Sequence, residues 1–272
     1  AIGWFAASAG YSILFVLPVL SALVSHPPRR SPTGAFSVTR ARGRPARGRP
    51  LIVVALHTRQ TLRATRVFAR AGALGTLIQS ENLSRALQRL SRIHPGLITS
   101  RTLILTPEFS AGDLCHFPHA ALPLGSFLAR HPHTRILIGA VIPVRLTAGA
   151  ASGCTDGAAL FRGARLLSLV SASQPAPISE WNPLHSGPDY PAHWFRSALI
   201  RLPHGGSLAV LVCYEGTVPW FPLLAASDAP RALLSMDSDL WPHGRQAAAF
   251  EARIVRAWGR FYGIPVAIAD AS

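Results

Sequence analysis

The chain has 272 residues, enough for one ordinary core or two small ones, and its 49% hydrophobic and 14% charged residues are an apolar balance for a purely soluble protein. The formal net charge is +15 and every basic residue is an arginine, which excludes a catalytic lysine. The three cysteines, at positions 115, 154 and 213, are too few and too far apart for a disulfide framework, and they leave the redox compartment open.

Residues 1–25 are predicted to form a membrane-spanning helix. The run from Ile2 to Val24 contains no charged side chain, and about 20 such residues span a bilayer. A signal-peptide core or a buried helix are the alternatives, but the run is long for a signal core and no basic region precedes it. We expect this helix to be the last of several.

Residues 26–50 are predicted to be a disordered tether. The segment is rich in proline and arginine and ends in two copies of Ala-Arg-Gly-Arg-Pro, at 41–45 and 46–50. The Arg-Gly-Arg-Pro core resembles an AT-hook, whose arginines enter the DNA minor groove. A basic linker beside anionic lipid is the favoured interpretation, so we expect a membrane lipid partner rather than nucleic acid.

From residue 51 to residue 272 apolar runs predict an α/β layered domain. Leu83, Leu87 and Leu90 share one face of a predicted helix, and a second helix is expected from about Arg245 to Arg260. The last predicted strand stops without a closing turn, so we expect the domain to be truncated at its C-terminus. The predicted strands are 51–56, 102–106, 135–142, 160–170, 197–202, 208–212, 232–235 and 264–269.

The run Ser207–Glu215 carries the strongest chemical signal. An apolar strand ends there in Cys213, which is followed by Tyr214 and Glu215. A thiol held rigidly at a strand end can serve as a nucleophile, although a lone cysteine there is as readily explained as a small core residue.

Two further glutamates occupy special places. Glu108 ends the strand that begins at Thr102, and Glu180 lies in the run Pro177–Pro183. A carboxylate at a strand end can act as a general base toward a thiol close by in space. Each glutamate alone is more readily explained as a solvated or structural acid. Glu108, Glu180 and Glu215 together, in this order, are a far more specific signal.

Together these motifs resemble those of the nitrilase, or carbon–nitrogen hydrolase, superfamily. The matching pattern is a strand ending in Glu108, a loop Pro-x-x-Glu-aromatic-x-Pro around Glu180, and a strand ending in Cys213-Tyr-Glu. The segment Ser235–Trp241 continues the resemblance with small differences. The most similar branch contains the apolipoprotein N-acyltransferases and the conjugal-transfer protein TraB. The fold implied is an αββα sandwich preceded by a membrane-spanning helix.

The resemblance implies a role for each side chain. Glu108 would deprotonate Cys213, whose thiolate attacks a carbonyl and forms an acyl-thioester. Glu180 would be a second essential glutamate, on a loop over the site. Trp181 would line an apolar substrate groove or pack as an ordinary aromatic residue. The pocket beside the thiol would be shaped by Tyr214 and Glu215.

One member of the family's catalytic set is missing. The lysine that stabilises the tetrahedral intermediate falls, by the family's spacing, on Ala172. Loss of one oxyanion stabiliser lowers turnover by about 10²–10³, and without the cation less thiolate forms at neutral pH. Arg162 or Arg165 could reach in from the preceding strand, although a guanidinium pairs more naturally with a carboxylate.

Neither a metal nor a cofactor is expected. Cys115 and His119, with His131 and His133 downstream, fit no common zinc spacing. Cys154 is interpreted as a small packed residue, and the sequence has no phosphate-binding glycine loop with the required lysine.

Two functions stay open on the sequence. The first is a membrane-anchored enzyme that acts on an acyl or amide substrate through a Cys213 thioester, as an N-acyltransferase or amidase, with a link to conjugal transfer. The second is a catalytically inactive binding module whose arginine-rich tether contacts lipid or nucleic acid. The family arrangement implies the bacterial inner membrane with the domain in the periplasm, although arginines after the helix favour the cytoplasm. The oligomeric state is left open.

Overall fold

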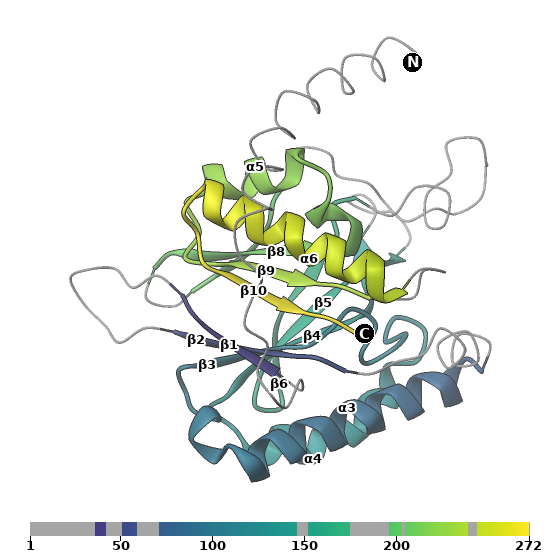
Figure 1. Cartoon of the computed structure of the whole chain (residues 1–272). Coiled ribbons are helices and arrows are strands. Elements are labelled where there is room, and N and C mark those ends of the chain that lie inside the picture. The colour runs from purple at the N-terminus through teal and green to yellow at the C-terminus, as the bar shows by residue number, and fades with distance from the viewer. Residues whose placement is uncertain are drawn as a thin grey trace, which may run out of the picture.

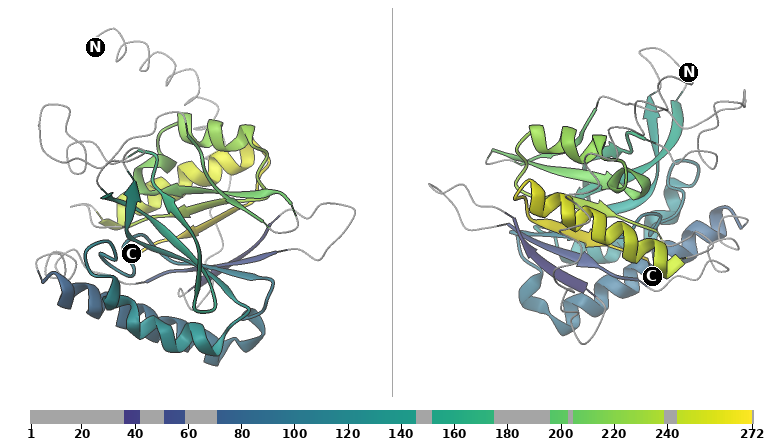
Figure 2. Two further views of the ribbon diagram at one scale, coloured as in Figure 1. Left: turned by 180° about the vertical axis from the view of Figure 1, so that it is seen from behind. Right: turned by 45° about the horizontal axis from the view of Figure 1, so that its top comes forward.

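The computed structural model describes residues 36–41, 51–58, 71–145, 152–174, 196–202, 205–238 and 244–271. They form four layers, with two β-sheets face to face between outer helices (Figure 1). Two further views show the helical layers on opposite outer faces (Figure 2). The expected αββα arrangement is therefore observed. One sheet is covered by α3 (Ala73–Ile93) and α4 (Leu122–Arg130), and the other by α5 (Trp220–Ser227) and α6 (Gly244–Phe261).

The first sheet has six strands in the order β1-β2-β3-β4-β5-β6. β2, β3 and β4 run parallel, whereas β1, β5 and β6 join antiparallel. Parallel strands covered on both faces explain the continuous apolar runs of the sequence. The strands are β1 (Phe36–Arg40), β2 (Ile52–Leu56), β3 (Thr102–Leu105), β4 (Arg135–Arg145), β5 (Ser152–Arg162) and β6 (Arg165–Ser171).

The second sheet has four strands in the order β10-β9-β8-β7. β7 (Ala198–Arg201) pairs antiparallel with β8 (Ser207–Val212). β8, β9 (Leu233–Met236) and β10 (Val266–Ala269) run parallel to one another. Each of these strands was predicted to within about two residues at its ends.

Successive side chains of the buried strands fill different cores. In β2, Val53 and Ala55 face the second sheet, whereas Val54 faces the helices. Leu83 and Leu87 of α3 pack into that outer core, which confirms the predicted apolar face. The period-2 alternation therefore builds the inter-sheet core and the helical core from the same strands.

The first strand lies inside residues 26–50, the segment expected to be a disordered tether. β1 pairs with β2 over its five residues, and Ala41 N donates to Leu51 O at 3.0 Å. The ring of Phe36 packs against His94 with a centroid distance of 4.8 Å. A short polar edge strand gains its hydrogen bonds from its neighbour, and local composition does not reveal that neighbour. The rest of the tandem repeat, 42–50, lies outside the described residues.

The prediction of one strand over residues 160–170 is wrong. The chain turns back at Gly163 (φ +52°), so β5 and β6 form an antiparallel hairpin. A Cβ at Gly163 would lie 2.8 Å from Pro132 Cα. Both the left-handed backbone and the close approach therefore require glycine at the turn.

Within the described ranges, no helix is long and apolar enough to cross a membrane. The predicted span, residues 1–25, lies outside those ranges. The membrane anchor therefore stays a prediction.

Candidate active site

Cys213 lies where β8 ends and a short 3₁₀ helix, Cys213–Gly216, begins. Its side chain is 7% exposed, and its φ of +48° is a left-handed conformation that residues other than glycine rarely adopt. Such a conformation persists only where the surroundings enforce it, and it is typical of functional positions. The strand end thus holds, in a fixed place, a thiol that is not part of a disulfide.

Glu108 follows β3 by three residues and is 2% exposed. The turn that carries it rests on β4: a Cβ at Gly139 would lie 2.2 Å from Pro107 O and 2.8 Å from Glu108 Cα. Gly139 N also donates to Thr106 Oγ1 at 3.0 Å, which ties the turn to the same strand. The next residue, Phe109, has φ +53°. Glycine at 139 therefore sets how closely the glutamate turn packs on the sheet.

The two sheets bring the carboxyl ends of their parallel strands to one edge. His57, directly after β2, forms a parallel bridge with Asp270, directly after β10, and His57 Nδ1 lies 2.9 Å from Asp270 Oδ1. β3 is parallel to β2, and β8 is parallel to β10 through β9. Glu108 and Cys213, which follow β3 and β8, therefore lie at the same edge of the sandwich. Contact between the carboxylate and the sulfur stays a prediction.

Glu215 holds the backbone around the thiol. Its buried carboxylate accepts N–H groups from Ser173 and Gln174 through Oε1 and from Val212 through Oε2, the last two at 2.9 and 2.8 Å. These bonds tie the loop after β6 to the end of β8, next to Cys213. The resemblance implied a side chain that shapes the pocket, and the contacts add a positioning role.

Ala172, the position that the resemblance assigns to the family's lysine, lies in this same loop. It is 3% exposed and belongs, with Cys213, to the core between the sheets. Its N–H donates to Asp156 O at 2.8 Å. The backbone at position 172 is therefore fixed from β5, while the side chain offers only a methyl group.

The two arginines considered as substitutes lie at the far end of the hairpin. Arg162 pairs with Arg165 beside the turn, whereas Ser171 ends β6 next to Ala172. At about 3.3 Å per residue, β6 separates Arg165 from Ser171 by roughly 20 Å. Neither guanidinium reaches position 172, so the structure excludes the substitution by arginine that the sequence had left open.

Two buried aspartates at this edge were not among the predicted site residues. Asp156, on β5, is 2% exposed and supplies the carbonyl that holds Ala172. Asp237, directly after β9, is 1% exposed, and its Oδ1 accepts the Ser235 hydroxyl at 2.8 Å. The family-like segment Ser235–Trp241 could have marked Asp237, but no sequence signal marks Asp156.

Three predicted residues complete the set. Tyr214 is half-buried in the 3₁₀ helix, where its carbonyl accepts the Thr217 hydroxyl at 2.8 Å. Glu180 and Trp181 lie outside the described residues, so their place over the site stays a prediction.

Cys115 and Cys154 form a disulfide bond, although their separation of 39 residues gave no reason to pair them. The loop after β3 crosses β4, where Leu114 N donates to Val141 O at 3.0 Å, and β5 returns beside β4. Cys154 is therefore a bridging residue, and its interpretation as ordinary packing is wrong.

The histidines considered together with Cys115 do not gather around it. His131 packs on the ring of Phe127, and its Nε2 lies 3.2 Å from Ser91 Oγ. Burial, and then the charge of Arg130, lower the pKa of His131. Within the described part of the chain, the histidine beside Cys115 and Cys154 is His116.

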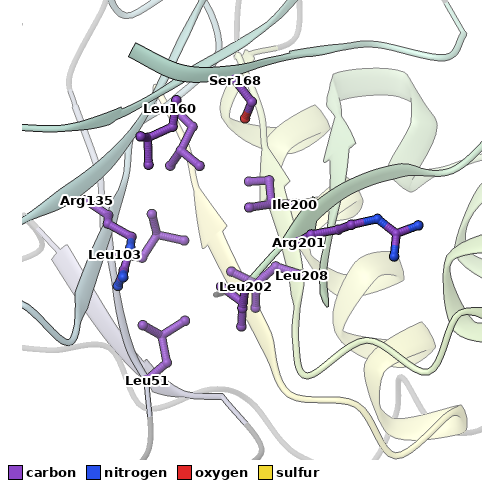
Figure 3. A pocket seen from close by; sticks show the side chains of 10 residues that line it. Leu51, Leu103, Arg135, Leu160, Ser168, Ile200, Arg201, Leu202 and Leu208 are labelled. Atoms are coloured by element: carbon purple, nitrogen blue, oxygen red, sulfur yellow. The ribbon is translucent and has the colours of Figure 1, made fainter. Parts of the chain in front are cut away.

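A cavity of about 300 Å³ lies between the sheets at the opposite edge (Figure 3). Its lining includes Leu51, Leu103, Arg135 and Leu208, which stand at or near the amino ends of β2, β3, β4 and β8. Cys213 follows the carboxyl end of β8, so this cavity is separate from the thiol.

No protein-family model matches the chain. A curated relative, the conjugal transfer protein TraB of Agrobacterium fabrum, is 30% identical over 105 residues, which cover 37% of this chain. The match spans 25%, about a quarter, of that relative's length.

Solved structures resemble the chain over most of its length. A mutant of the Nesterenkonia AN1 amidase from the nitrilase superfamily superposes with a TM-score of 0.51 at 15% identity, covering 80% of this chain and 74% of the amidase. The carbon–nitrogen hydrolase from Helicobacter pylori G27 gives a TM-score of 0.51 at 12% identity, covering 72% and 68%. Another amidase mutant, at a TM-score of 0.50 and 17% identity over 80% and 74%, carries the acetamide moiety of fluoroacetamide at its active site cysteine. The chain has the mixed α/β fold of the nitrilase superfamily.

Proposed function

We propose that this domain makes or breaks an amide bond through a thioester on Cys213. The observation that carries the proposal is the thiol itself, a cysteine outside any disulfide that is held with φ +48° at the carboxyl end of β8. The buried Glu108 lies at the same edge, where it would act as general base. Strained, immobile nucleophiles beside a carboxylate are the arrangement that covalent acyl transfer requires.

In the proposed first step, Glu108 takes the thiol proton and the Cys213 sulfur attacks the substrate carbonyl carbon. The C–N bond then breaks, and the leaving amine takes its proton from Glu108. Water or an acceptor amine next attacks the thioester, loses a proton to Glu108 and releases the sulfur, which regains its proton. Water gives an amidase and an amine gives an N-acyltransferase.

Ala172 makes this a slow or altered enzyme. No cation from Arg162 or Arg165 reaches the place where the family's lysine would stand, because both lie at the other end of β6. One missing oxyanion stabiliser lowers turnover by about 10²–10³. We expect activity to be weak and to rise with pH as the thiolate forms.

The similarity to TraB and the predicted anchor support a finer proposal. It is an N-acyltransferase-like or TraB-like protein of the bacterial inner membrane, linked to conjugal transfer, with its domain in the periplasm and with membrane lipid as partner. A Cys115–Cys154 disulfide supports an oxidising compartment. Protease access in intact and in lysed spheroplasts would test this placement.

A catalytically inactive binding module is the second candidate, and Ala172 favours it. In this form the domain keeps the fold, and the arginine-rich segment between 26 and 50 contacts lipid or nucleic acid. The two candidates differ in one measurable property, which is whether the folded chain acylates itself faster than an unfolded one.

The test is intact-mass spectrometry of the oxidised full chain after incubation with an activated acyl ester. Because Cys115 and Cys154 are joined in the disulfide, Cys213 is the cysteine left to react, and one cysteine adduct is expected. Cys213→Ala should remove the adduct, Glu108→Gln should slow it by about 10²–10⁴, and Glu81→Gln on the exposed face of α3 should change nothing. No adduct up to about pH 9, or labelling no faster than in urea-unfolded chain, favours the binding module.

A further inference from the structure

A cluster of side chains of metal-ligating type includes neither Cys213 nor Glu108. The loop after β3 contributes Cys115 and His116, and the start of β5 contributes Cys154. Their ligand atoms all lie within 4.8 Å of one another. The loop is fixed to β4 by a bridge between Asp113 and Val141, so the cluster sits on a sheet rather than on a free loop.

His116 is oriented by Asp113. His116 Nδ1 lies 2.7 Å from Asp113 Oδ2, while Asp113 Oδ1 accepts the N–H groups of Cys115 and His116 at 3.1 and 3.0 Å. A carboxylate only accepts, so Nδ1 carries the proton, which leaves the Nε2 lone pair for a ligand; Cys154 Sγ lies 3.5 Å from Nε2 and 3.8 Å from Nδ1, beside the ring. A carboxylate that fixes the ring through one nitrogen while the other faces outward is the usual support of a metal-bound histidine.

We propose that the reduced form of this cluster binds one zinc ion through Cys115, His116 and Cys154. Zinc bonds of about 2.3 Å to sulfur and about 2.0 Å to nitrogen place tetrahedral ligands about 3.5 Å apart, close to the sulfur–nitrogen distance seen here. A water molecule takes the fourth position. Thiolate and imidazole ligands favour zinc over magnesium or calcium.

The disulfide and the metal exclude each other. A phosphine or dithiol reductant supplies two electrons to the Cys115–Cys154 bond, and the two sulfurs become thiols while the reductant is oxidised. Zinc then replaces one proton on each thiol, and both protons pass to solvent. In either state the loop that follows Glu108 stays joined to β5, so the zinc ion substitutes for the covalent link.

Cobalt(II) is the probe, because tetrahedral thiolate coordination gives it strong visible d–d bands and sulfur-to-cobalt charge-transfer bands. The full chain is reduced with a phosphine, freed of reductant without oxygen, and titrated with cobalt and then zinc. We expect one cobalt per chain in the reduced form, none in the oxidised form, and loss of the bands when zinc is added. The oxidised chain is its own control and needs no substitution.

Variants locate the site. His116→Ala should weaken metal binding at least 100-fold, and Asp113→Asn should weaken it about 10–100-fold through the ring orientation. His119→Ala, at an exposed histidine of the 3₁₀ helix Pro118–Ala121 that follows the loop, and Cys213→Ala should leave metal binding unchanged. Equal binding by the oxidised chain, unchanged binding in His116→Ala, or loss of binding in Cys213→Ala each overturns the proposal.

Discussion

The Glu215 carboxylate offers the sharpest test of how the thiol is positioned. Glu215 is 1% exposed and accepts backbone N–H groups of Ser173, Gln174 and Val212. Leaving a buried donor without its acceptor costs about 1–3 kcal/mol, so Glu215→Ala should lower the free energy of unfolding by about 4 kcal/mol. Glu215→Gln keeps one acceptor oxygen and turns an amide N–H toward the remaining donors. Glu215→Gln should therefore lower the free energy of unfolding by about 2 kcal/mol.

Urea unfolding of the oxidised full chain in mild detergent, followed by tryptophan fluorescence, measures both losses. Glu81→Gln is the matched control, because the Glu81 side chain is exposed. Its ion pair with Arg85 is weak: Glu81 Oε1 lies 3.9 Å from Arg85 Nε, and such a contact contributes about 0.5 kcal/mol or less. If Glu215→Ala unfolds within about 0.5 kcal/mol of that control, the carboxylate does not clamp the loop after β6 to the end of β8, and our account of the turn fails.

Three further predictions concern single side chains. Gly139→Ala should destabilise the fold by about 1–3 kcal/mol and slow Cys213 labelling, because its Cβ would lie 2.2 Å from Pro107 O. Gly125→Ala on α4 is the control. A Cβ there meets nothing within 4 Å, so this variant should be neutral or stabilising in the same unfolding experiment. Burial raises the pKa of Glu251 to about 7 from its usual 4.5, so stability should fall as pH rises from about 4.5 to about 7. Glu251→Gln should therefore melt higher than wild type at pH 8 but not at pH 4, and equal melting temperatures at pH 8 would contradict this. Ala172→Lys should speed acyl labelling at pH 7 by up to about 10²-fold, and a rate no greater than wild type would show that the cation cannot act from this loop.

Most strands and the turn at Cys213 could be predicted because their signals are local. A continuous apolar run such as 51–56 reports burial on both faces, and it forms β2 between two cores. Cys213 ends such a run, so its place at a strand end follows from the sequence. The helix carrying Leu83 and Leu87 follows from spacing alone.

The missed features all depend on neighbours that are distant in sequence. β1 becomes a strand because β2 offers it an edge, and Cys154 meets Cys115 because β4 carries both the crossing loop and β5. The hairpin turn at Gly163 was missed because apolar residues stand on both sides of it. The two strands that flank the turn were therefore interpreted as one. Each of these three features depends on which strands pair and in what register, and a short window of sequence does not contain that information.

The loop after β6 keeps its shape without a charged side chain at position 172. The residue is held by its own N–H on Asp156, and the next two residues are held by Glu215, so the loop depends on no side chain at 172. A lysine there would add charge to a frame that is already fixed by backbone hydrogen bonds. Under the proposed thioester chemistry, an alanine at 172 would remove only electrostatic stabilisation, because backbone hydrogen bonds to Asp156 and Glu215 hold the loop. Substitution of Glu215 should therefore change stability, whereas Ala172→Lys should change the rate of acyl labelling.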